Sequence, residues 1–133
     1  KRINVSDAFT DTLGATGWAS YVVAPVGRSG IAFLGDAGKI VGTGRERVPS
    51  VRDEPGNLTA TVALASGDGP VTLQGYAASA PSVSAKGGSA APVSYDAATG
   101  HFTTVVTAAA NPRLRKLDGE KVNIVTVAFK AKQ

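Results

Sequence analysis

Turn-forming residues interrupt this chain so often that little room remains for a helix. Its 133 residues include 16 glycines and 7 prolines, and the stretches between them are short and rich in apolar and β-branched side chains. Residues 20–25 and 30–34 are two such stretches, bounded by Gly, Pro and Ser. Short bounded apolar runs are typical of buried strands. The spacing of the turns therefore predicts an all-β chain.

Residues 58–64 alternate with period two, as a strand with one buried face does. One face carries Leu58, Ala60, Val62 and Leu64, and the other carries Thr59, Thr61 and Ala63. Residues 71–76 form a similar run directly after the turn-forming residues 66–70. These turn residues let a chain reverse direction, so the two runs are predicted to pair as a hairpin.

A second hairpin is predicted from residues 92–95 and 101–107. Asp96 can cap the turn between them through its carboxylate, and Gly100 can adopt the positive φ that a following bulge requires. Residues 121–129 are largely apolar on both faces. This last strand should therefore lie at the centre of a sheet.

Strand candidates separated by about ten residues, with turn signals between them, are typical of a sandwich or a barrel. We expect one domain over residues 1–133 with an antiparallel β-sandwich fold, either jelly-roll or immunoglobulin-like. The one helical feature is the spacing of Phe9 and Leu13, which predicts a single helical turn before Gly14 ends it.

The residue types that catalysis and metal binding need are scarce. Cysteine is absent and His101 is the only histidine, so neither a Cys/His dyad nor a zinc site is expected. Asp53 and Glu54 are the only adjacent carboxylates, and neighbours on a strand face opposite ways. Asp36, in a loop with glycines, is a candidate ligand for a structural calcium ion. The chain is therefore not expected to be an enzyme or to need a cofactor, with structural calcium left open.

Positive charge is in excess and gathers near the C-terminus. Lys and Arg total 14 against 10 Asp and Glu, a net charge of +4, and six of the cations follow residue 112. Such a surface favours acidic partners, whether polysaccharide, nucleic acid or lipid. Phe129 is the only aromatic of that region, which argues against a nucleic-acid partner, and no apolar run is long enough to cross a membrane. A solvated surface with a basic tail is the alternative.

Aromatic and basic side chains are the candidates for ligand binding, because sugar rings stack on aromatic faces and cations hold acidic groups. The candidates are Trp18, Tyr21, Lys39, Arg45, Arg47 and Tyr76. Trp18 is either an exposed platform or a plug over the end of the sandwich. On a strand, Arg45 and Arg47 would project from one face and could grip uronate or pyruvyl carboxylates. Charges that protect a sheet edge from aggregation are the alternative for these two arginines.

Four stretches resemble the ancillary β-sandwich modules of bacterial polysaccharide-degrading enzymes, including the xanthan-degrading type. They are residues 17–25, 30–36, 71–76 and 93–102, the last with the motif Tyr-Asp-x-x-Thr-Gly-x-Phe. The resemblance implies a secreted, extracellular carbohydrate-binding module that directs the catalytic domain of the same parent chain to a polysaccharide. Together with the basic charge, it implies an acidic glycan such as xanthan. The shortage of aromatics favours a groove for single soluble chains.

The chain begins at Lys1 and contains no Met, so a longer parent protein is expected. A structural β-sandwich that braces or spaces a neighbouring catalytic domain is the alternative function. Such a domain needs no ligand site, and it would expose a large apolar surface when separated from its neighbour.

Overall fold

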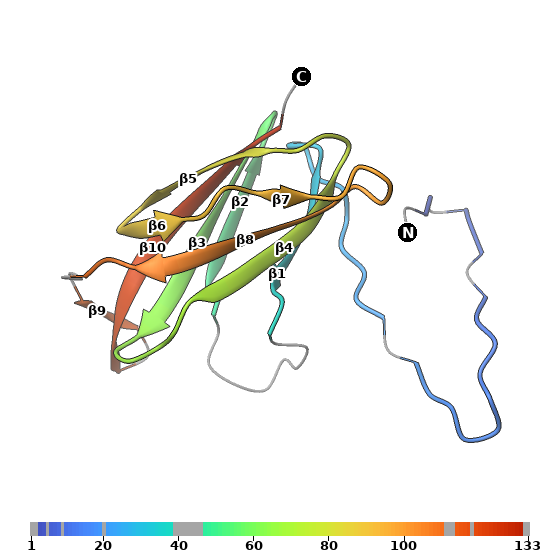
Figure 1. Cartoon of the computed structure of the whole chain (residues 1–133), viewed down its shortest axis with the longest axis horizontal. Coiled ribbons are helices and arrows are strands. Elements are labelled where there is room, and N and C mark those ends of the chain that lie inside the picture. The colour runs from blue at the N-terminus through green and yellow to red at the C-terminus, as the bar shows by residue number, and fades with distance from the viewer. Residues whose placement is uncertain are drawn as a thin grey trace.

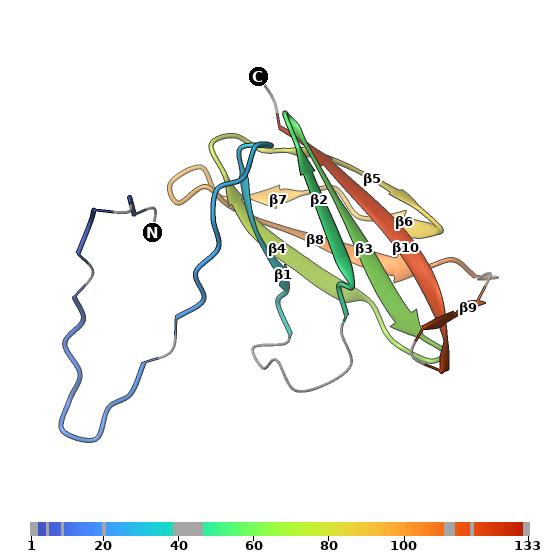
Figure 2. The same ribbon diagram turned by 180° about the vertical axis from the view of Figure 1, so that it is seen from behind.

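Two antiparallel sheets pack face to face in the computed structural model of the chain, which Figures 1 and 2 show from opposite sides. The structure describes residues 3–4, 6–8, 10–19, 21–38, 47–110, 114–117 and 119–131, and none of these is helical. Within that part of the chain no helix could cross a membrane. The strands are β1 (Ile31–Asp36), β2 (Ser50–Glu54), β3 (Asn57–Ala65), β4 (Val71–Ala77), β5 (Ser82–Lys86), β6 (Gly88–Ala90), β7 (Ser94–Tyr95), β8 (His101–Ala108), β9 (Leu114–Leu117) and β10 (Glu120–Lys130).

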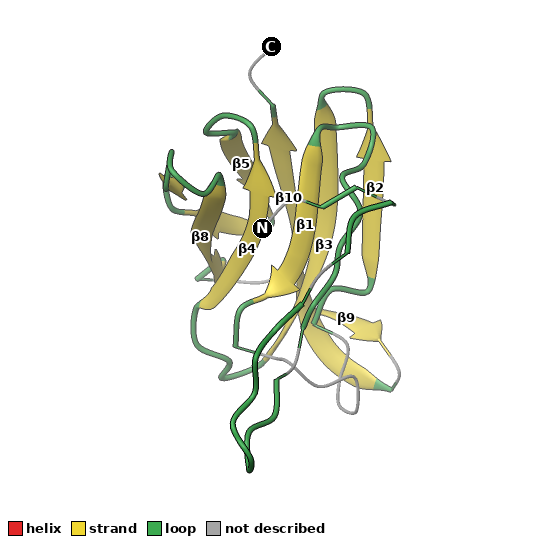
Figure 3. Cartoon of the chain, turned by 90° about the vertical axis from the view of Figure 1, so that its right-hand side faces the viewer, coloured by secondary structure: helices red, strands yellow, loops and turns green. Residues whose placement is uncertain are grey.

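Each sheet contains five strands. Sheet A has the order β1-β4-β8-β6, and β7 also pairs with β8. Sheet B has the order β2-β3-β10-β5, and β9 also pairs with β10. Figure 3 colours the described chain by secondary structure and shows strands joined by loops and turns. The prediction of an all-β antiparallel sandwich is confirmed.

The core lies between the two sheets and is built from alternate positions of the strands. Leu58, Ala60 and Val62 of β3 are at most 2% exposed, whereas the threonines between them are half-buried. Phe102 of β8 and Phe129 of β10 are fully buried, with ring centroids 5.4 Å apart. Burial of one such side chain contributes about 1.5–3 kcal/mol. Because the two rings come from different sheets, their contact holds the sandwich together.

Two predictions about local structure are confirmed. β10 is central, since it pairs with β3 along most of its length and with β5 and β9 on its other side. The second hairpin is present as the pairing of β7 with β8. In its turn the Ala98 amide donates to Asp96 Oδ1 at 2.9 Å, and Gly100 has a φ of 76°.

The predicted hairpin of residues 58–64 and 71–76 is wrong, although both runs are strands. β3 pairs with β2 and β10 in sheet B, whereas β4 pairs with β1 and β8 in sheet A. The turn residues between them therefore carry the chain from one sheet to the other. This arrangement brings the apolar faces of β3 and β4 together across the core, where a hairpin would have left them side by side.

The strand predicted at residues 20–25 is also wrong. Its described residues, 21–25, belong to an extended N-terminal segment, by which we mean the described residues between 3 and 26. This segment lies outside the sandwich, as Figures 1 and 2 show, and most of it is exposed. The described residues of 7–13 contain no helical turn. Apolar runs without a partner surface do not recover the entropy lost by ordering them, so neither run forms a regular element.

A carboxylate holds the start of the sandwich in place. Asp53 of β2 accepts hydrogen bonds from the amides of Arg28, at 2.5 Å, and Ser29, at 3.0 Å. Both residues lie in a tight turn in which the Gly30 amide donates to the Gly27 carbonyl at 3.0 Å. The turn that leads into β1 is thereby fastened to the edge strand of the opposite sheet.

Candidate functional site

Side chains that point away from the core give sheet A a polar outer face. In β4 and β8, inward positions alternate with positions that are half-buried or exposed. The outward positions are Thr72, Gln74 and Tyr76 of β4 and His101, Thr103, Val105 and Thr107 of β8. Ser94 of β7 pairs with Thr103 and extends the same face.

Two rings and an amide form a cluster on this face, which we call the Tyr76 cluster. Tyr76 and His101 are directly opposite in the β4–β8 register, with ring centroids 5.1 Å apart and planes inclined by 54°. His101 Nε2 lies 3.3 Å from Gln74 Oε1, so the tautomer with a proton on Nε2 donates to the amide oxygen. This contact orients the imidazole beside the tyrosine ring.

The chemistry of the Tyr76 cluster suits a sugar. A pyranose ring presents C–H groups that pack on an aromatic face, while its hydroxyls require donors and acceptors. The cluster supplies the ring of Tyr76 and the amide of Gln74, and the threonine hydroxyls along β8 lie on the same face. Among the described residues this outer face carries no Asp or Glu, the side chains that glycoside hydrolysis uses in pairs.

Trp18 and Tyr21 lie on the N-terminal segment and do not belong to the sandwich. Trp18 is 83% exposed, so the interpretation of this residue as a plug over the core is wrong. The Tyr21 hydroxyl donates to the Asp11 carboxylate, and this side-chain hydrogen bond, with a smaller effect of desolvation, raises the pKa of Tyr21. The structure gives both residues a solvent-facing position.

Arg47 does not project from a strand as predicted, because it lies in the loop that precedes β2. Its Nη1 donates to the Asp68 carboxylate and to the Ala63 carbonyl, the latter at 3.0 Å. Its Nε lies 3.6 Å from Asp36 Oδ2, and the side chain is only 14% exposed. The guanidinium is therefore occupied by two carboxylates of the chain itself, and we remove Arg47 from the candidate ligand-binding residues. Lys39 and Arg45 lie outside the described residues.

Asp36 is similarly occupied and does not fit the calcium site considered from the sequence. Its Oδ1 accepts from the Gly38 amide at 2.8 Å, and its Oδ2 faces the Arg47 guanidinium. A cation beside the carboxylate repels a second cation and takes up an oxygen that calcium would need. In the described part of the chain, no three His, Cys, Asp or Glu side chains gather into a metal-binding group.

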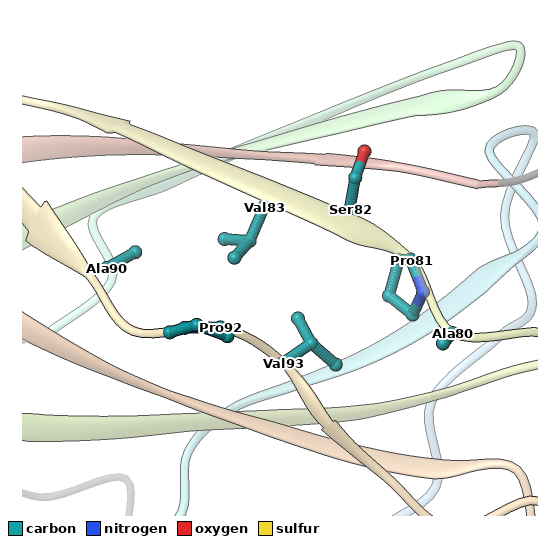
Figure 4. Close-up of a pocket in the computed structure, with 7 residues that line it drawn as sticks. All are labelled: Ala80, Pro81, Ser82, Val83, Ala90, Pro92 and Val93. Carbon is teal, nitrogen blue, oxygen red and sulfur yellow. The ribbon is translucent and has the colours of Figure 1, made fainter.

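A separate pocket opens between β5 of sheet B and the β6–β7 segment of sheet A, as Figure 4 shows. Its volume is about 370 Å³, and its lining residues are Ala80, Pro81, Ser82, Val83, Ala90, Pro92 and Val93. Only one of these side chains is polar. Because sugar hydroxyls lose water on binding and need replacement partners, this pocket suits a glycan less well than the Tyr76 cluster.

The sequence singles out Tyr76 as a candidate and leaves His101 open as a solvated hairpin residue or a ligand contact, but it does not place Gln74 with them. The three residues come together only through the register of β4 with β8, which pairs positions 76 and 101. Alternation within each run was visible and could have placed Gln74 beside Tyr76 on one face.

Comparison with known proteins found no matching family model, no similar curated protein and no similar solved structure. The case for a function therefore depends on the geometry of the described residues.

Proposed function

We propose that this chain is a non-catalytic polysaccharide-binding module and that the outer face of sheet A is its binding surface. The observation that carries the proposal is the Tyr76 cluster, an aromatic pair with an attached amide on a sheet face where the described residues include no Asp, Glu, Lys or Arg. The half-buried ring of Tyr76 is held by its neighbours, so little side-chain entropy is lost when a sugar packs against it.

In this proposal the module is extracellular and is joined to the catalytic domain of a polysaccharide-degrading enzyme. The resemblance noted in the sequence supports that setting. An acidic target such as xanthan fits the net charge of +4, but Arg47 is not available to hold its carboxylates. Recognition of acidic groups has to involve other cations of the chain.

Affinity electrophoresis of the whole chain in gels that contain xanthan, alginate, polygalacturonate, xylan or β-glucan tests the proposal. We expect retardation on at least one gel, and a loss of about tenfold in affinity for Tyr76→Ala, since a stacked aromatic contributes about 1.4 kcal/mol. Tyr21→Ala is the matched control, because it removes a tyrosine from the N-terminal segment and should retain binding. Unchanged mobility on every gel contradicts the proposal, as does a loss of binding in the Tyr21 variant alone.

A structural role that braces a neighbouring catalytic domain is the second candidate, and the N-terminal segment favours it. Seven of the ten exposed large hydrophobic residues in the described chain lie in this segment. They are Ile3, Leu13, Trp18, Tyr21, Val22, Val23 and Val26. Apolar side chains concentrated in one exposed stretch mark an interaction site.

Trp18 provides the test of the second candidate, because it is the only tryptophan of the chain. In the isolated chain its fluorescence should be that of a water-exposed indole, since the side chain is 83% exposed. In a longer chain that includes the adjoining catalytic domain, a bracing role requires the emission to shift to the blue and to resist quenching by iodide. A quenching rate unchanged between the two chains argues against the bracing role.

A further inference from the structure

The outer face of sheet B differs in chemistry from that of sheet A. Thr59 and Thr61 of β3 point outwards because Leu58, Ala60 and Val62 fill the core, and they pair with Ala128 and Thr126 of β10. Ser50 Oγ donates to Thr61 Oγ1 at 2.9 Å, which shows that neighbouring hydroxyls on this face meet. The centre of the face is therefore a floor of hydroxyl and methyl groups.

Three exposed cations surround this floor, and we call them with it the basic face. Arg52 of β2 pairs with Thr59, and Lys86 of β5 pairs with Thr126. Lys130 of β10 lies between Asn57 and Ser82. Each cation occupies an outward-facing strand position, as does the floor residue beside it. Glu54 of β2 pairs with Asn57 and is exposed on the same face, and no ion pair in the described part of the chain joins any of the three cations to a carboxylate.

The register fixes the spacing of the three cations. With strands about 4.8 Å apart and about 6.8 Å between alternate residues, their Cα atoms lie about 12–16 Å from one another. Thr59, Thr126 and Ala128 occupy the space between them. Long flexible side chains at this spacing can reach separate acidic groups along one extended chain that crosses the floor.

Protection of sheet edges explains only part of this arrangement. Arg52 and Lys86 belong to β2 and β5, the terminal strands in the order of sheet B, where charges discourage aggregation. Lys130 belongs to β10 and has a strand partner on each side, so it protects no edge. Lys130 is therefore a cation of this face that edge protection does not account for.

We propose that the basic face is a second binding surface, which takes an extended chain of carboxylated or sulfated polysaccharide. The proposal does not depend on sugar binding by the Tyr76 cluster, which lies on the other sheet. It supplies the recognition of acidic groups that Arg47 cannot provide. Polysaccharide is favoured over single-stranded nucleic acid because no aromatic side chain among the described residues lies on this face, and such binders stack bases on aromatics.

Binding of the whole chain to polygalacturonate, dextran sulfate, neutral dextran and an oligothymidine, measured by affinity electrophoresis and by titration at several salt concentrations, tests the proposal. The test variant combines Arg52→Gln, Lys86→Gln and Lys130→Gln. The control combines Arg28→Gln, Lys116→Gln and Lys121→Gln, which removes the same charge from exposed positions elsewhere.

We expect the test variant to bind at least one of the two polyanions about tenfold more weakly, since three exposed ion pairs of about two- to threefold each multiply to that figure. The control variant should stay within about threefold of the unmodified chain, and affinity should fall as salt rises. Equal losses in the test and control variants would attribute binding to net charge and overturn the proposal. Tighter binding of the oligothymidine than of either polysaccharide, or no binding of any polyanion, would overturn it as well.

Discussion

The contact between Gly27 and Asp53 allows a quantitative test of the hydrogen bonds that join the turn before β1 to β2. A Cβ atom added to Gly27 would lie 1.9 Å from Asp53 Oδ2. Gly27→Ala therefore requires the carboxylate to move away from the amides of Arg28 and Ser29. Asp53→Ala removes the same two backbone hydrogen bonds directly, and both substitutions also separate the carboxylate from the Ser29 side chain, so they should have the same physical consequence.

The expected cost follows from the two hydrogen bonds. The bond from the Arg28 amide is exposed and contributes about 0.5 kcal/mol, while the partly buried bond from the Ser29 amide contributes about 1.5 kcal/mol. Each single variant should thus lose about 2 kcal/mol of unfolding free energy. The double variant should also lose about 2 kcal/mol, because the added methyl group no longer meets a carboxylate. The coupling energy of the cycle is then about 2 kcal/mol.

Urea denaturation followed by circular dichroism measures these differences, with m-values compared to establish two-state behaviour. Glu54→Ala is the matched control, since Glu54 is the exposed neighbour of Asp53 on the opposite face of β2, and its loss should stay within about 0.5 kcal/mol. A double variant that loses about 4 kcal/mol, the additive value, would refute the argument that the carboxylate is what restricts Gly27.

The same contact predicts a dependence on pH. A hydrogen bond from the Ser29 side chain has the largest effect on the pKa of Asp53 and lowers it. Desolvation raises this pKa, whereas the Ser29 and Arg28 amides and the charge of Arg28 lower it further. A carboxyl whose pKa is lower in the folded state stabilises the fold above the ordinary carboxyl pKa, near 3.9. That stability is lost as the pH falls from there through the folded-state pKa. The difference between the unmodified chain and Asp53→Ala should therefore shrink below about pH 4.

Three further predictions concern individual side chains. Arg47→Met should lower the free energy of unfolding, measured by urea denaturation, by about 2 kcal/mol, because two carboxylates lose their cation. The affinity for polysaccharide should stay unchanged. Weaker binding at unchanged stability would return Arg47 to the binding site. Gly75→Ala should lower the free energy of unfolding by about 2–3 kcal/mol and lower the melting temperature. Its Cβ would lie 2.7 Å from the Ala32 carbonyl oxygen and 2.8 Å from the Phe102 ring. A loss under about 0.5 kcal/mol would show that the Phe102 ring can move aside. Trp18→Ala should change stability by less than about 0.5 kcal/mol, because the side chain is 83% exposed; a larger loss would mean that the N-terminal segment packs on the sandwich in solution.

The strands that were predicted correctly are those whose formation depends on local pattern. The faces of β3 follow from the alternation of Leu58, Ala60 and Val62 with threonines, since a strand repeats every two residues. The β7–β8 hairpin follows from its own turn, where Asp96 caps the chain and Gly100 takes a positive φ. In both cases the decisive interactions lie within a few residues.

The errors arise where the partner of a run decides its structure. Turn residues at 66–70 indicate that the chain reverses, but not whether the next strand joins the same sheet or the opposite one. Residues 21–25 have the composition of a strand, yet no sheet edge receives them. For the candidate site, Arg47 was visible as a cation, but its pairing with Asp36 and Asp68 depends on loops that meet only in the folded chain.

The two proposed binding surfaces share a structural origin that makes them open to separate tests. Tyr76, Arg52 and Lys86 all occupy outward positions on strands whose inward positions form the core. Substitutions at such positions leave core packing intact and change stability little, whereas the same changes at inward positions such as Phe102 would unfold the sandwich. Loss of binding in these variants can therefore be assigned to the altered face.

Because the faces belong to opposite sheets, a chain that uses both should link two polysaccharide strands. Mixed solutions of the protein and an acidic glycan should therefore gain viscosity only while both faces are intact.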